Sequence, residues 1–230
     1  MSKKSVYFIT GIDTGVGKTF VTGLMARFLE KRGLDWISLK MVQTGNTGFS
    51  EDLDLHRSFC GGRSFPEDGA GLTAPQIFAF PSSPRLAARL EKRNVDLVAI
   101  DHAVAECSRR HDIVLVEGAG GLCVPLTGDC LSIDFAAARD WRTVLVTCGR
   151  LGAINHALLS LEALRSRQMP LAGVVHNFYP DADPIIDNDT VGEIREQLQR
   201  SGMPDVLVRV PQINPELPLP DIDFSSIFNL

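Results

Sequence analysis

The sequence has 230 residues, a length that suits one large domain, and its 44% hydrophobic and 22% charged residues are typical of a soluble globular protein. Lys and Arg number 23 against 28 Asp and Glu, so the net charge is −5 and broad binding to nucleic acid or to acidic membranes is disfavoured. No apolar run approaches the ~20 residues of a membrane span, and we expect no signal peptide.

Short apolar runs alternate with stretches of helical periodicity along the chain. This alternation predicts one α/β domain over residues 1–230, with a mostly parallel sheet and helices on both faces. Residues 181–187 and the Pro-rich segment 211–220 are expected to be loop, within a C-terminal segment 211–230. The expected strands are 6–10, 36–39, 113–116, 144–147, 172–175 and 206–210, and the expected helices are 18–32, 95–110, 155–167 and 189–200.

The first expected strand runs into a glycine-rich segment, residues 11–19, with the sequence GIDTGVGKT. This order of a strand, a glycine-rich loop and a helix that opens with Gly-Lys-Thr predicts a phosphate-binding loop. In such a loop Lys18 would reach the β- and γ-phosphates, and the Thr19 hydroxyl would bind Mg²⁺. The spacing is one residue longer than usual, because Ile12 stands at the customary first glycine. The alternative is a glycine turn that carries Gly-Lys-Thr by chance. A dinucleotide site is disfavoured because no Gly-x-Gly-x-x-Gly is present.

Charged residues follow two further expected strands. Lys40 ends the strand 36–39, where an open α/β sheet binds its ligands, although a surface lysine would look the same in sequence. Glu117 ends the strand 113–116 and precedes small residues, as a Mg²⁺ ligand near a substrate requires; an acidic strand-end cap is the alternative. Asp52 and Asp54 offer another carboxylate, but two positions apart on a helix they point about 200° from each other. Only one of them can face a metal.

Five segments in this order resemble dethiobiotin synthetases, from about residue 7 to residue 177. The resemblance implies an ATP- and Mg²⁺-dependent enzyme of biotin biosynthesis. Such an enzyme joins CO₂ or bicarbonate to 7,8-diaminopelargonate through a carbamate and a carbamic–phosphoric anhydride, and closes the ring to dethiobiotin. The segments are 11–19, 40–45, 81–84, 116–121 and 151–158.

The resemblance also assigns residues to roles. Lys40 and Lys18 are implied as catalytic, and Thr19, Asp52 and Glu117 as Mg²⁺ ligands. Asp52 is preferred to Asp54 because residues 50–53 resemble the family pattern more closely. The implied substrate contacts are Thr14, Thr44, Gly120 and Asn155. The implied contacts of ATP and its metal are Asp13, Thr14, Gly15, Val16, Gly17, Lys18, Thr19, Phe20, Asp52, Glu117, Gly118, Ala119, Gly120, Asn177 and Pro211.

The resemblance further implies a homodimer whose substrate site crosses the interface. The segment 149–158 opens a helix near Asn155, and a helix N-terminus can hold an anion. In the family this loop comes from the neighbouring subunit, so Asn155 is expected to hold the carboxylate of the diamine in trans. His176 departs from the small residue expected beside Asn177.

Two other classes of protein share parts of these motifs. ParA- or MinD-like ATPases, which bind a partner, carry a lysine early in the loop, where this sequence has Asp13. Amidotransferase domains of cobyrinate-type synthases belong to longer chains than one ending at Leu230.

The remaining reactive residues give weaker signals. The five cysteines form no Cys-x-x-Cys pair, which predicts reduced thiols in a cytoplasmic protein; Cys123 and Cys148 are expected to be packing residues. The histidines show no metal-ligand spacing and are expected at the surface or in structural positions. They are His56, His102, His111, His156 and His176.

Overall fold

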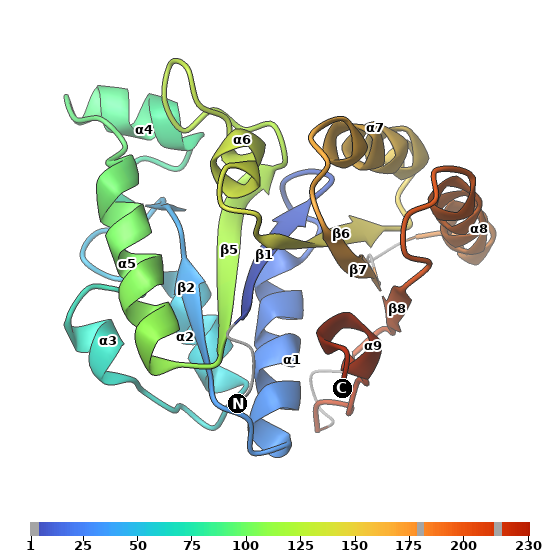
Figure 1. The fold of residues 1–230 in the computed structure, drawn as a ribbon, viewed down its shortest axis with the longest axis horizontal. Helices are drawn as coiled ribbons and strands as arrows, with labels where there is room; N and C mark the ends of the chain where they lie inside the picture. Colours follow the sequence, from blue (N-terminus) through green and yellow to red (C-terminus); the bar gives the residue numbers. More distant parts are fainter. Residues whose placement is uncertain (1–4, 179–181, 214–217) are drawn as a thin grey trace.

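The computed structural model describes residues 5–178, 182–213 and 218–230 and shows one central sheet between two layers of helices (Figure 1). In this part of the chain six strands pair in parallel in the order β2-β5-β1-β6-β7-β8. Their bounds are β1 (Ser5–Gly11), β2 (Trp36–Lys40), β5 (Ile113–Gly121), β6 (Arg142–Cys148), β7 (Leu171–Asn177) and β8 (Leu207–Val210).

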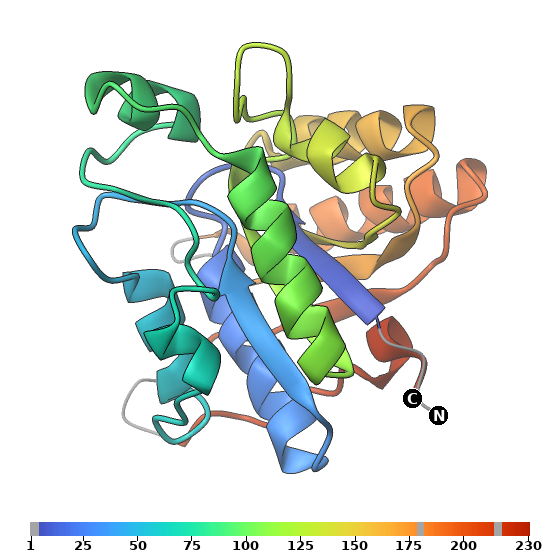
Figure 2. The same ribbon diagram turned by 60° about the vertical axis from the view of Figure 1, so that its left-hand side comes forward.

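The helices cover both faces of the sheet, as Figure 2 shows for α5 (Leu97–Arg110) in front of it and α1 (Lys18–Lys31) behind. With right-handed crossovers, α6 (Ser132–Ala137), α7 (Ala153–Ser166) and α8 (Pro184–Arg200) lie on the side of α5. The short segments β3 (Gln43–Thr44) and β4 (Ile77–Phe78) pair in parallel apart from the main sheet. The other helices are α2 (Glu51–Ser58), α3 (Pro66–Gly69), α4 (Pro84–Leu90) and α9 (Ser225–Phe228).

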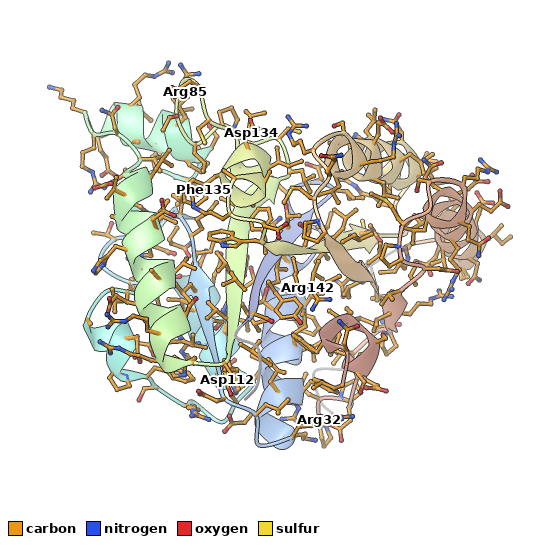
Figure 3. All side chains as sticks on the ribbon, viewed as in Figure 1. Arg32, Arg85, Asp112, Asp134, Phe135 and Arg142 are labelled. Carbon is orange, nitrogen blue, oxygen red and sulfur yellow. The ribbon has the colours of Figure 1, made fainter. Side chains whose placement is uncertain are left out.

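Buried aromatic and aliphatic side chains fill the space between these layers (Figure 3). The strands are apolar on both faces because helices cover both, which is why they read as continuous apolar runs. Phe135, labelled in Figure 3, packs edge-to-face on Trp141 with ring centroids 5.6 Å apart. None of the described helices is long and apolar enough to cross a membrane.

All six expected strands are present, and one expectation about loops needs correction. The segment 181–187 is not all loop: Asp181 lies outside the described residues, but α8 begins at Pro184. Asp183 caps this helix, because its side chain accepts a hydrogen bond from the backbone N–H of Ile185 at 2.7 Å, and proline suits the first helical position.

In the C-terminal segment 211–230, residues 211–213 and 218–220 form no helix or strand, as expected for a loop. The last residues of the segment form α9, whose Phe228 stacks on Phe28 of α1 with centroids 5.9 Å apart. Phe224, just before α9, is fully buried. Phe224, Ile227 and Phe228 therefore belong to the core of the domain, while the other residues of 218–230 are exposed or half-buried.

Candidate active site

The loop between β1 and α1 presents backbone N–H groups at the start of α1. Gly15 and Gly17 have φ angles of 75° and 87°, in the left-handed region that glycine adopts readily. A Cβ at Gly17 would also lie 2.1 Å from the amide nitrogen of Asn177. In the described structure no side chain caps α1, so its first N–H groups and the positive end of its dipole can receive phosphate oxygens.

Lys18 lies folded under this loop. Its side chain is buried, and Nζ donates a hydrogen bond to the backbone oxygen of Asp13 at 3.0 Å. Burial lowers the pKa of Lys18 to about 8, with a further lowering by Lys40, while Glu117 and Asp52 act in the opposite direction. A phosphate at this position would stabilise the charged ammonium that burial disfavours.

Lys40 and Glu117 meet at the carboxyl ends of the neighbouring strands β2 and β5. They are direct partners in the sheet register, and Nζ of Lys40 lies 2.8 Å from Oε1 of Glu117. Burial would lower the pKa of Lys40, but Glu117 and Asp52 outweigh it and raise that pKa. Burial would likewise raise the pKa of Glu117, but Lys40 and His56 hold it well below its usual range. Both groups are therefore charged at neutral pH.

The helix α2 brings Asp52 to the same pair. Ser50 caps this helix, accepting a hydrogen bond from the N–H of Leu53 at 3.2 Å, and Asp52 forms an ion pair with Lys40. Asp54 points to the other side and is exposed. Of the two aspartates, Asp52 is therefore the one that lies beside Lys40 and Glu117.

These elements enclose a pocket of about 330 Å³. Eleven of the expected site residues line this pocket. They belong to the phosphate-binding loop, β2, β3, α2 and β5, so segments far apart in sequence share one cavity. They are Thr14, Gly15, Gly17, Lys18, Thr19, Lys40, Thr44, Asp52, Glu117, Ala119 and Gly120.

The residues expected at the nucleotide base lie behind the loop. Asn177, at the end of β7, is buried and its Nδ2 donates to the backbone oxygen of Val16 at 3.1 Å. Pro211 follows Val210, which is the register partner of Asn177 in β8, so both residues lie at one sheet edge. His176 beside them is buried and structural, as expected, with Nε2 2.8 Å from Oδ1 of Asp187.

Five other expected site residues lie outside that pocket, and one of them, Val16, is buried in the loop. Asp13 forms an ion pair with Arg150 of the β6–α7 loop. Phe20 packs its ring on Phe59, 5.1 Å away, and so turns towards α2. Asn155 is exposed in the first turn of α7. Gly118 is buried in β5, where a Cβ would lie 3.0 Å from the ring of Phe8.

Among the remaining reactive side chains, one cysteine differs from its expected role. Cys123 is exposed rather than a packing residue, whereas Cys148 is buried as expected. His56 is in a structural position, as expected: it is fully buried, with Nε2 2.8 Å from Oε2 of Glu117. Its sequence signal was its position four residues after Asp52, which places both side chains on one face of α2.

The oxygen atoms at the site fit a magnesium ion. Thr19 Oγ1 lies 2.9 Å from Glu117 Oε1, and the carboxylates of Glu117 and Asp52 both contact the ammonium of Lys40, so this position already stabilises a cation. No group of three His, Cys, Asp or Glu residues in the described ranges could hold a metal by itself. Two carboxylates and a hydroxyl suit Mg²⁺, which takes its other ligands from water and phosphates.

Comparison with known sequences identifies the family. A family model described as an AAA domain matches residues 5–216. The ATP-dependent dethiobiotin synthetase BioD 2 of Pasteurella multocida is 43% identical over 195 residues, which are 85% of this chain and 92% of the relative. The chain belongs to the dethiobiotin synthetase family. A second relative is the ATP-dependent dethiobiotin synthetase BioD of Chlorobaculum tepidum, which is 44% identical over 200 residues. The aligned residues are 87% of this chain and 84% of the relative.

Membership of the dethiobiotin synthetase family makes the chain an ATP-dependent ligase. Solved structures show the P-loop NTPase-like fold expected from the sequence. A ParA family ATPase from Chlorobium tepidum has a TM-score of 0.54 at 16% identity, covering 93% of this chain and 86% of its own. MinD in the MinC:MinD complex of Aquifex aeolicus has a TM-score of 0.52 at 17% identity, covering 93% and 83%. At sequence identities this low, the similarity to these two structures shows the fold alone.

Proposed function

We propose that this chain converts 7,8-diaminopelargonate, CO₂ or bicarbonate and ATP to dethiobiotin, ADP and phosphate with Mg²⁺, in the cytoplasm. The observation that carries the proposal is the pair of buried lysines, Lys18 and Lys40, in one pocket with the oxygens of Thr19, Asp52 and Glu117. Membership of the dethiobiotin synthetase family supports the choice of substrates.

The reaction has three steps whose atoms and electrons balance. One amine of the diamine attacks CO₂ and loses a proton, which gives a carbamate. A carbamate oxygen then attacks the γ-phosphorus of ATP and ADP leaves, forming a carbamic–phosphoric anhydride. The second amine attacks the carbamate carbon, phosphate departs with the bridging oxygen, and loss of a proton leaves the cyclic urea.

The second step brings two anions together, and the lysines oppose that repulsion. Lys18 lies beneath the loop that would hold the β- and γ-phosphates, and Lys40 lines the same pocket, so two positive charges would act on the transferring group. Such charges act most strongly in a site that excludes water. Thr19, Asp52 and Glu117 would hold Mg²⁺, which when bound supplies further neutralisation of phosphate charge.

Further residues in and around the pocket would orient the two substrates. Thr14, Thr44 and Gly120 line the pocket and would contact the diamine, and Ala119 beside them would contact ATP. Asn177 would read the base by releasing its hydrogen bond to Val16. Pro211 would contact the same base from the loop after β8, while the loop from Asp13 to Phe20 would wrap the phosphates.

The far end of the diamine carries a carboxylate that needs a separate anchor. We place that anchor on a second copy of the chain, at Asn155 and the N-terminus of α7. Exposed apolar side chains on either side of it, Leu151 at 86% and Leu159 at 61% exposure, suit a homodimer interface.

The proposal is tested by measuring ADP formation with and without the diamine and bicarbonate. We expect turnover to require both, because the carbamate is the nucleophile. ATP hydrolysis that is equal in their absence would instead favour a partner-binding ATPase of the ParA class.

A further inference from the structure

We propose that His56 is a positioning residue that fixes the carboxylate of Glu117 for binding metal-bound nucleotide. The inference rests on the proposed Mg²⁺ site. It concerns the side of Glu117 that faces away from the pocket, where a chain of hydrogen-bonded polar groups reaches from the half-buried Asp68 of α3 to β5.

The two oxygens of Glu117 have separate surroundings. Oε1 accepts hydrogen bonds from Thr19 at 2.9 Å and from Lys40 at 2.8 Å, on the pocket side. Oε2 lies 2.8 Å from Nε2 of His56. Because His56 and Glu117 are both fully buried, water cannot replace this second contact. His56 therefore sets the rotation of the carboxylate, and with it the direction of Oε1.

The hydrogen-bond partners determine which nitrogen of His56 carries the proton. Arg57 donates from Nη1 to Oγ of Ser38 at 2.7 Å, and a guanidinium can only donate. The hydroxyl hydrogen of Ser38 is then free to point at Nδ1 of His56, 3.1 Å away. With Nδ1 accepting, Nε2 carries the hydrogen and donates it to Glu117. The N–H at Nε2 thereby orients the carboxylate of Glu117.

Arg57 is itself held in place from α3. Its Nε and Nη2 donate to the two oxygens of Asp68 at 3.1 and 2.7 Å, a paired geometry that fixes the plane of the guanidinium. Nη2 also donates to the backbone oxygen of Ser38 at 3.1 Å. The order Asp68, Arg57, Ser38, His56, Glu117 is thus continuous, and each group has a partner that limits its rotation.

Groups that orient a metal ligand in this way commonly change metal affinity 10- to 100-fold when removed. A histidine that only filled space would leave metal affinity unchanged when an apolar residue of similar size replaced it. The two roles therefore make different predictions for His56→Leu, which removes the donor, and His56→Gln, whose amide can restore an N–H near Nε2.

The test measures Mn²⁺ binding by electron paramagnetic resonance in the presence of a non-hydrolysable ATP analogue, with thermal unfolding recorded for each variant. We expect His56→Leu to weaken Mn²⁺ binding about tenfold and His56→Gln to recover most of it. The matched control is His102→Leu, at an exposed histidine of α5, which should bind as the wild type does. Wild-type affinity in a folded His56→Leu protein, or equal weakening in His56→Leu and His56→Gln, would overturn the proposal.

A second variant keeps the test valid if His56→Leu does not fold. Ser38→Ala leaves the imidazole in place but removes the hydroxyl that fixes its tautomer, and we expect weaker Mn²⁺ binding than in the wild type. Unchanged binding in folded Ser38→Ala would then contradict the proposal. The diamine takes no part in this measurement, so failure of the proposed reaction and failure of this inference remain distinguishable.

Discussion

Lys40 and Glu117 are paired residues of two adjacent parallel strands, and their side chains meet at 2.8 Å in a buried position. The register of the sheet fixes this contact, because a shift of one residue would turn either side chain to the opposite face. The most important ion pair of the site is therefore positioned by backbone hydrogen bonds and not by a mobile loop.

Removal of either buried lysine should slow turnover strongly. We expect Lys40→Ala and Lys18→Ala each to lower kcat at least ~10²-fold, since each loses a charge that stabilises the transferring phosphoryl group. Lys18→Ala should also weaken ATP binding. Steady-state kinetics with Lys92→Ala, an exposed lysine, as the control provide the measurement. Wild-type turnover in Lys40→Ala would exclude this lysine from the chemistry.

The two aspartates of α2 should differ in their effect on the metal requirement. Asp52→Asn should raise the Mg²⁺ concentration for half-maximal activity, because it removes a charged oxygen from the pocket. Asp54→Asn is the matched control on the exposed side of the same helix. Titrations of activity with Mg²⁺ compare them, and the reverse order of effects would show that Asp54 is the ligand.

Much of this site could be predicted from the sequence because its residues follow strands. The ends of parallel strands converge at one edge, so Lys40 and Glu117 could be expected together before their contact was seen. The contact of Ser38 with His56 could not be expected, since a chain of hydrogen bonds between side chains leaves no periodic pattern in the sequence. His56 offered only its spacing of four residues from Asp52. α9 was missed for a similar reason: a helix of four residues is stabilised by packing on α1 and not by its own pattern.

The stability of the domain should depend on pH through His176. Burial lowers the pKa of His176; the contact with Asp187 only partly offsets this, and Arg209 lowers it further. Below pH ~6.5 the unfolded chain binds a proton at this residue that the folded chain does not, so the unfolding free energy falls as pH falls towards the folded pKa.

Urea unfolding of the wild type and of His176→Gln at pH 7.5 and 5.5 measures this contribution. The glutamine variant does not titrate, so its unfolding free energy should fall less over this range. The difference is limited to about 1.4 kcal/mol per pH unit. An equal fall in both proteins would show that His176 keeps the same pKa on unfolding.

A shared site at a dimer interface predicts complementation between inactive variants. Lys40→Ala damages the pocket of its own chain, whereas Asn155→Ala should damage the pocket of the partner. When the two proteins are mixed and exchange subunits, a mixed dimer regains one intact site, and up to about a quarter of wild-type activity should return in an equal mixture. Confirmed exchange without recovered activity, or an active monomer in sedimentation, would rule out the shared site.

The central claim is that a carbamate, and not water, attacks the γ-phosphate of ATP in this pocket. Mass spectrometry of phosphate formed from ¹⁸O-labelled bicarbonate in unlabelled water, over times shorter than oxygen exchange, tests it directly. We expect one ¹⁸O in each phosphate, released together with one cyclic urea. If phosphate stays unlabelled with ¹⁸O-bicarbonate and becomes labelled only when the reaction is run in ¹⁸O-water, then water is the nucleophile and attack by a carbamate is contradicted.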